Sequence, residues 1–157
     1  MALFVGRHVN KIDKKGRVSV PKTFRAALQA QGSAVVYAYP LLKRQAIEAC
    51  GEAFMERLSA RLEDIDMELF NAPVVDIDAL PDSQNDLAEM LLEDAHVLSF
   101  DPEGRVILPK ALVDYTGMSG EAVFVGRGAR FQIWAPSVYR PKRRPMIGPT
   151  CDAGDSG

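Results

Sequence analysis

The chain repeats one short motif at an offset of 88 residues, and this repetition constrains its fold more than any other feature. The segments HVNKIDKKGRVSVPK (residues 8–22) and HVLSFDPEGRVILPK (residues 96–110) agree at eight of fifteen positions. At the same offset, SAVV (33–36) falls opposite EAVF (121–124). A lone two-stranded unit cannot bury its apolar face, so two copies need each other. We therefore predict that the fold packs the two copies together.

Each copy contains a D-x-x-G-R turn. The carboxylate of Asp13 or Asp101 is suited to accept hydrogen bonds from backbone N–H groups two or three residues further on. The glycine, Gly16 or Gly104, supplies the positive φ that the last position of such a turn needs. These four residues predict a hairpin-like turn between two short strands in each copy.

The residues after each turn alternate, which predicts a short strand with one buried face. The side chains expected to face inward are Val18, Val20, Val106 and Leu108, and those expected to face away are Arg17, Ser19, Arg105 and Ile107. Asp13 and Arg17 are placed to pair, which would orient the guanidinium more than stabilise the fold. Pro21 and Pro109 end the strands and suit the first turn of a short helix.

Charge is distributed unevenly along a chain whose net charge is only -2. Residues 1–44 carry nine basic side chains and one acidic side chain, for a charge of +8. Residues 45–96 carry two basic and fourteen acidic side chains, for -12, and residues 97–157 carry eight and six, for +2. A basic first quarter favours a polyanion-binding surface. The alternative is that these basic residues are scattered over a solvated surface.

The acidic interval between the copies is typical of two helices joined by a connector. Apolar residues recur every three to four positions from Lys43 to Glu68, which indicates an amphipathic helix. A second helix is predicted in residues 81–96, with Asp82 or Ser83 as its N-cap. Residues 32–40 are expected to form a short strand region without the hairpin that residues 121–134 indicate. The last residues, rich in proline and glycine, are expected to be disordered.

Other chemistries find little support in the sequence. Cys50 and Cys151 have no partner spacing and are interpreted as free thiols. His8 and His96 occupy equivalent repeat positions, which favours a shared structural role over a paired site. No catalytic constellation, phosphate loop or metal-ligand spacing is present, so we predict no enzyme, cofactor or metal site. The chain shows neither a signal peptide nor a membrane span, and we expect a cytoplasmic protein.

The duplicated D-x-x-G-R-x-x-x-P unit, followed in the second copy by FVGRGARFQIWAP (124–136), resembles the MraZ family of bacterial transcription regulators. This family belongs to the AbrB-like swapped-hairpin superfamily, and the resemblance spans residues 6–139. It implies an α+β fold in which two tandem repeats form a double-split β-barrel with packed amphipathic helices. It also implies a ring-shaped homo-oligomer that binds direct repeats upstream of the division and cell-wall operon, usually repressing it and residing on the nucleoid.

On this hypothesis Arg17 and Arg105 are the central contacts to double-stranded DNA, because an arginine fork can hold a guanine edge or a phosphate. The supporting phosphate or base contacts are expected to be Lys15, Lys14, Lys11 and Arg7. The turns are organised by Asp13, Gly16, Asp101 and Gly104. The first copy is expected to contribute more to binding, because Pro102 and Glu103 replace Lys14 and Lys15 in the second turn.

The expected organisation is a first repeat at 7–54, a helical connector at 55–93, a second repeat at 94–137 and a tail at 138–157. The helices are expected to pack on the barrel and on neighbouring subunits, with their acidic faces away from DNA. The alternative function is a protein-interaction or antitoxin-like module whose acidic helices bind a basic partner.

Overall fold

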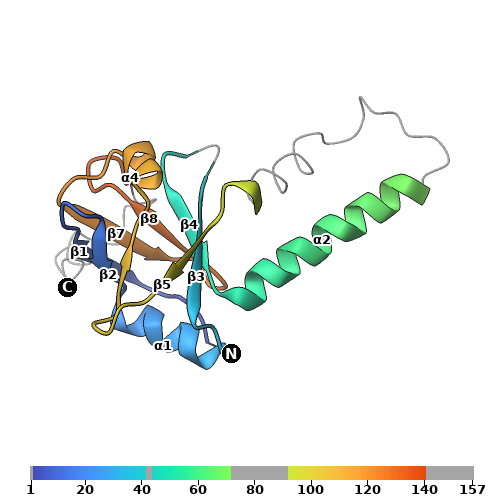
Figure 1. Ribbon diagram of the computed structural model, residues 1–157, viewed down its shortest axis with the longest axis horizontal. Coiled ribbons are helices and arrows are strands. Elements are labelled where there is room, and N and C mark those ends of the chain that lie inside the picture. Colours follow the sequence, from blue (N-terminus) through green and yellow to red (C-terminus); the bar gives the residue numbers. More distant parts are fainter. Residues whose placement is uncertain (1, 42–43, 72–91, 141–157) are drawn as a thin grey trace, which may run out of the picture.

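The computed structural model describes residues 2–41, 44–71 and 92–140, and within these ranges the protein has an α+β fold (Figure 1). The strands are β1 (Arg7–Lys11), β2 (Arg17–Ser19), β3 (Val35–Pro40), β4 (Ile47–Cys50), β5 (His96–Ser99), β6 (Arg105–Ile107), β7 (Glu121–Gly126) and β8 (Phe131–Trp134). The helices are α1 (Lys22–Ala30), α2 (Glu52–Asn71) and α4 (Lys110–Thr116).

Strand pairing crosses between the two copies of the repeat. Six strands form an antiparallel sheet in the order β1-β7-β8-β4-β3-β5, and β2 pairs with β6 in a separate antiparallel ribbon. The first strand of each copy pairs with the third strand of the other, β1 with β7 and β5 with β3. Only a single bridge, Ile12 with Val18, joins the two sides of the first turn. Neither copy therefore completes its sheet alone.

The core joins both copies through aromatic side chains. Phe24 of α1 lies 5.0 Å from Phe131 of β8 and 5.5 Å from Phe4, measured between ring centroids. Phe124 of β7 completes this fully buried group. The side chains expected to face inward after the turns are buried as predicted, and these are Val18, Val20, Val106 and Leu108. Offset and edge-to-face aromatic pairs add to the stabilisation from burial.

The prediction of a helix beginning at Lys43 is wrong, because Ile47–Cys50 forms strand β4. All four of its residues are buried, and β4 pairs with β3 on one side and β8 on the other. A short apolar run has the same appearance in a buried strand and in a helix, so periodicity did not distinguish them. The helix begins at Glu52, after Gly51.

The prediction that the first copy lacks a hairpin after its helix is also wrong. β3 and β4 pair antiparallel, as β7 and β8 do in the second copy. Val35 lies opposite Ser99 and Glu121 lies opposite Lys11, so Val35 and Glu121 are equivalent and the offset here is 86. The offset shrinks because α1 has 9 residues and α4 has 7, a difference of two.

Near its beginning, helix α2 contacts the sheet through Phe54, Met55 and Leu58, which pack with Tyr39 and Cys50. Its later turns project away from the sheet (Figure 1). Residues 72–91, which hold part of the predicted helical connector and most of the predicted second helix, lie outside the described residues, as do most of the predicted tail and Cys151. Among the helices that the structure describes, none is both long and apolar enough to cross a membrane.

A buried polar link ties the hairpin of the first copy to that of the second. The Tyr39 hydroxyl donates to Oε2 of Glu48 at 2.6 Å, and Nε of Arg130 donates to Oε1 at 2.7 Å. The nearby thiol of Cys50 is buried, and burial together with the Glu48 carboxylate raises its pKa to about 12. Because the reactive form of a cysteine is the thiolate, this thiol is chemically inert near neutral pH.

Candidate nucleic-acid interface

The first D-x-x-G-R turn is organised around the Asp13 carboxylate. Its Oδ1 accepts hydrogen bonds from the backbone N–H groups of Lys15 and Arg17, each at 2.9 Å, and its Oδ2 accepts from Nε of Arg17 at 2.6 Å. The donors are thus two and four residues further on, rather than two and three. The backbone N–H of Gly16 donates to the Asp13 carbonyl at 3.0 Å. One side chain therefore fixes both the turn and the direction of the arginine.

The second turn repeats this geometry almost atom for atom. Oδ1 of Asp101 accepts from the backbone N–H groups of Glu103 and Arg105, each at 2.9 Å, and Oδ2 accepts from Nε of Arg105 at 2.8 Å. The N–H of Gly104 donates to the Asp101 carbonyl at 3.0 Å. The side-chain pair expected at Asp13 and Arg17 is present in both copies.

The pKa of each turn aspartate lies below its ordinary value of 3.8, chiefly because the backbone N–H of the following arginine donates to the ionised carboxylate. The side chain of that arginine and the second backbone N–H lower the pKa further. A lowered folded-state pKa means that these contacts stabilise the fold fully above 3.8 and are lost as the pH falls through the lowered value.

We expect a carboxyl NMR titration to give Asp13 and Asp101 pKa values below 3.8 in the folded protein. In Arg17→Gln the backbone donors remain and the guanidinium is removed, so the pKa of Asp13 should rise only part of the way towards 3.8. Asp101 in that variant serves as the internal control and should change little. A value at or above 3.8 for Asp13 in the unsubstituted protein would contradict the described geometry.

The β2–β6 ribbon presents both arginines on one face. Arg17 lies opposite Ile107, and Ser19 lies opposite Arg105. Residues directly opposite one another in an antiparallel pair point to the same side, and the intervening pair of Val18 and Val106 is buried. The exposed face of the ribbon therefore carries two guanidinium groups beside Ile107, a residue that is 60% exposed. Sequence reasoning placed Ile107 on this face without giving it a role.

Both turn glycines are held against other groups by tertiary contacts. Gly16 has a φ of +84°, and a Cβ at this position would lie 2.7 Å from the Leu108 carbonyl oxygen of the other copy. Gly104 has a φ of +78°, and a Cβ there would collide with the guanidinium of Arg25 from α1. Both glycines therefore serve the backbone conformation, and at Gly16 space also requires glycine because the obstructing atom belongs to the backbone.

The two turns differ in charge although they share a geometry. Lys14 and Lys15 are exposed at the tip of the first turn. In the second turn, Oε2 of Glu103 lies 3.5 Å from Nη2 of Arg105. Because Asp101 also pairs with Arg105, this arginine faces two carboxylates. Within the described residues, nothing accepts a hydrogen bond from the terminal nitrogens of Arg17. The first turn is thus the more electropositive, and its arginine is more available to a ligand.

Lys11 and Arg7 lie at opposite ends of β1. Lys11 is exposed at the end that leads into the first turn and lies opposite Glu121. Arg7 begins the strand, about 13 Å away at an ordinary strand rise, and its guanidinium lies 5.7 Å from the ring centroid of Tyr139. The structure therefore brings Lys11 together with the first-turn residues and places Arg7 apart from them.

The two histidines lie on equivalent strands but do not form a pair. His8 is on β1 and His96 is on β5, which are the two terminal strands in the order of the six-stranded sheet. The His8 ring meets Phe24 edge-on at 5.4 Å between centroids. This placement supports the structural role inferred from the repeat.

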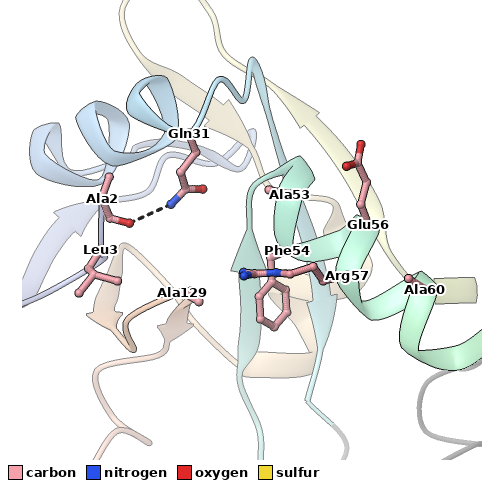
Figure 2. Close-up of a pocket in the computed structure, with 9 residues that line it drawn as sticks. All are labelled: Ala2, Leu3, Gln31, Ala53, Phe54, Glu56, Arg57, Ala60 and Ala129. Carbon is pink, nitrogen blue, oxygen red and sulfur yellow. Dashed lines mark hydrogen bonds between the residues drawn. The ribbon is translucent and has the colours of Figure 1, made fainter. Parts of the chain in front are cut away.

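A separate pocket of about 490 Å³ lies between the N-terminal segment and the beginning of α2 (Figure 2). The amide of Gln31 donates to the Ala2 carbonyl at 3.3 Å across one side, and Arg57 lies over the Phe54 ring on the other. Its lining is Ala2, Leu3, Gln31, Ala53, Phe54, Glu56, Arg57, Ala60 and Ala129. This lining supplies no nucleophile with an adjacent base, so the pocket does not have the chemistry of a catalytic site.

Two arginine-bearing turns on one ribbon face define a candidate nucleic-acid-binding protein of the α+β class. Comparison with known proteins places this chain more specifically. Residues 91–141 match the family model described as "MraZ protein, putative antitoxin-like".

Two relatives are each named transcriptional regulator MraZ. That of Parvibaculum lavamentivorans is 42% identical over 140 residues, covering 88% of this chain and 80% of the relative. That of Rickettsia akari is 38% identical over 139 residues, covering 88% and 85%. The chain belongs to the MraZ family.

Proposed function

We propose that this protein is a sequence-specific DNA-binding transcription regulator that reads DNA with the exposed face of the β2–β6 ribbon. The observation that carries the proposal is the pair of identical D-x-x-G-R turns, which hold Arg17 and Arg105 on that one face. An arginine fork is suited to guanine O6 and N7, and Ile107 beside it is suited to a thymine methyl group. Lys11, Lys14 and Lys15 would contact phosphates around the first turn.

The family resemblance extends this proposal to assembly and target. The crossed pairing of the two copies is compatible with a double-split β-barrel of the swapped-hairpin type. A ring of such subunits would bind direct repeats in the promoter of the division and cell-wall operon and repress that operon. The protein would then be cytoplasmic and associated with the nucleoid. Each subunit offers a small contact surface, and a ring raises the effective concentration of each further contact.

Fluorescence anisotropy with the DNA upstream of the protein's own gene tests the proposal. We expect saturable binding that unlabelled specific DNA displaces better than random DNA. The logarithm of affinity should fall by about 0.9 per log unit of salt for each phosphate neutralised. Equal displacement by both competitors would contradict sequence-specific recognition, and no binding at low salt would contradict the DNA-binding proposal altogether.

The charge difference between the turns gives a gain-of-binding prediction. Glu103→Lys removes the carboxylate 3.5 Å from Arg105 and makes the second turn resemble the first. We expect DNA affinity at low salt to rise about three- to tenfold, because one more cation faces the phosphates. Glu56→Lys makes the same charge change on the exposed side of α2 and should have a smaller effect, measured by the same titration. Equal gains from both variants would contradict a role for the second turn.

A second candidate function, a module that binds a basic protein, is favoured by the projecting helix α2. The acidic residues of α2 include Glu52 and Glu56 near its beginning. Capture of a stoichiometric protein from lysate, unaffected by nuclease, would favour this alternative. Loss of captured material on nuclease treatment would favour the DNA-binding proposal.

A further inference from the structure

Arg25 lies on α1, which belongs to the first copy of the repeat, yet its side chain packs against the turn of the second copy. A Cβ atom at Gly104 would lie 2.7 Å from Cζ of Arg25 and would collide with its Nη1. The close approach of this guanidinium is therefore possible only because position 104 is a glycine. Sequence reasoning did not identify Arg25, since α1 follows the first turn along the chain and not the second.

Two hydrogen bonds hold the Arg25 side chain and the second turn together. Nε of Arg25 donates to the Val20 carbonyl at 3.1 Å. The N–H of the same Val20 donates to the Gly104 carbonyl at 3.3 Å. Because Nε is occupied and the side chain is half-buried, the guanidinium has a fixed direction before any ligand binds. A preorganised side chain loses less conformational freedom on binding than a mobile one.

The terminal nitrogens of Arg25 remain available. Within the described part of the chain, no carboxylate pairs with Arg25 and nothing accepts a hydrogen bond from Nη1 or Nη2. The nearby Asp101 carboxylate is already engaged by two backbone N–H groups and by Nε of Arg105. A concavity of about 500 Å³ opens at this place, with Arg25, Asp101, Pro102 and Gly104 in its lining.

The position of Arg25 complements the composition of the two turns. The first turn carries Lys14 and Lys15, whereas the second carries Pro102 and Glu103. At the 88-residue offset, the position equivalent to Arg25 is Val113, which packs against the core. Between these two helix positions the arginine therefore occurs only in α1, the helix that reaches the turn without lysines, and it adds a cation beside a turn whose own cation, Arg105, faces two carboxylates.

We propose that Arg25 contacts a DNA phosphate beside the second turn, an inference that rests on the proposed DNA-binding function. A guanidinium with two free terminal nitrogens matches the geometry of phosphate oxygens. The ligand is a backbone phosphate and not a base edge, because Arg25 comes from α1 and not from the exposed face of the β2–β6 ribbon. Arg25 is thus a positioning contact that sets the second turn on the DNA backbone.

The test compares Arg25→Gln, Arg25→Lys and Arg57→Gln in anisotropy titrations of promoter DNA over a salt series. Arg25→Gln should weaken low-salt binding about tenfold, as expected for one charge-assisted hydrogen bond. The decrease of log affinity per log unit of salt should become smaller by about 0.9 for each subunit in contact with DNA, and this decrease is called the salt slope below. Arg25→Lys keeps the charge without the Val20 hydrogen bond and should retain the slope. Arg57→Gln removes the same charge from α2 and should change neither quantity.

Three results would overturn the inference. Equal effects of Arg25→Gln and Arg57→Gln would indicate a general charge effect. An affinity loss in Arg25→Gln with an unchanged slope, matched by an equal loss in Arg25→Lys, would indicate that Arg25 only supports the turn. Unchanged binding by Arg25→Gln would show that it contacts no DNA. If the unsubstituted protein binds no promoter DNA, the proposed function itself fails. Melting curves of all variants identify any loss that comes from unfolding.

Discussion

Arg17→Ala is expected to cause the largest loss of DNA binding of any single substitution in this protein. The guanidinium is held by Asp13 through Nε at 2.6 Å, and among the described residues nothing occupies its terminal nitrogens, which leaves them to meet a base edge. Losing one bidentate base contact costs about 1 to 3 kcal/mol, or about ten- to hundredfold in affinity. In a multisubunit complex the loss recurs at every subunit in contact with DNA.

Arg105→Ala is the matched variant in the second copy, and we expect it to cause a smaller loss. Arg105 has the same partner geometry, but Glu103 competes for its Nη2 and the turn lacks lysines. Anisotropy titration of both variants against one promoter fragment measures the difference, and Arg57→Ala on α2 controls for general charge. The fold should tolerate both changes, because exposed ion pairs contribute little to stability. Equal losses from the two variants would overturn the asymmetry between the turns.

Gly16→Ala is expected to cause a large loss of stability. Alanine at a φ of +84° is strained, and its Cβ would lie 2.7 Å from the Leu108 carbonyl oxygen. Relief of this contact requires the backbone to move, which breaks the hydrogen bond from the Leu108 N–H to the Gly16 carbonyl at 2.8 Å. Strain and a lost buried hydrogen bond together destabilise the fold by about 3 kcal/mol.

Gly32→Ala is the matched control for Gly16→Ala. Gly32 also has a positive φ, +76°, but a Cβ there would meet nothing within 4 Å. Gly32→Ala should therefore lower the free energy of unfolding only by the backbone strain, about 1 kcal/mol. Thermal or urea unfolding at one fixed protein concentration measures both variants, since assembly makes stability concentration-dependent. Equal destabilisation by the two substitutions would contradict the close packing of the first turn against the second copy.

The turns were predictable from sequence because their chemistry is local. Asp13 and Gly16 act on backbone groups within a few residues, and alternation after the turn correctly assigned Val18 and Val106 to the core. The repeat also required the copies to pack together. Within each copy, therefore, the positions of the predicted central residues followed from spacing alone.

The remaining features depend on tertiary structure. Ile47–Cys50 is a strand because β3 and β8 flank it, and no local signal in the apolar run reveals those neighbours. Arg25 reaches the second turn only because the strands of the two copies pair across each other. Arg7 falls outside the first-turn group because it begins the five-residue strand β1, whose other end leads into the turn. Local patterns therefore predicted the geometry of the two turns but not the tertiary contacts around them.

A footprint of the purified protein on the DNA upstream of its own gene tests the central claim most directly. If arginines from both turns of a repeated assembly read DNA, the unsubstituted protein should protect evenly spaced direct repeats. The Arg17→Ala variant should lose that protection at the same concentration. No protection of this DNA at low salt, or a footprint that Arg17→Ala leaves unchanged, would contradict DNA recognition by the β2–β6 face.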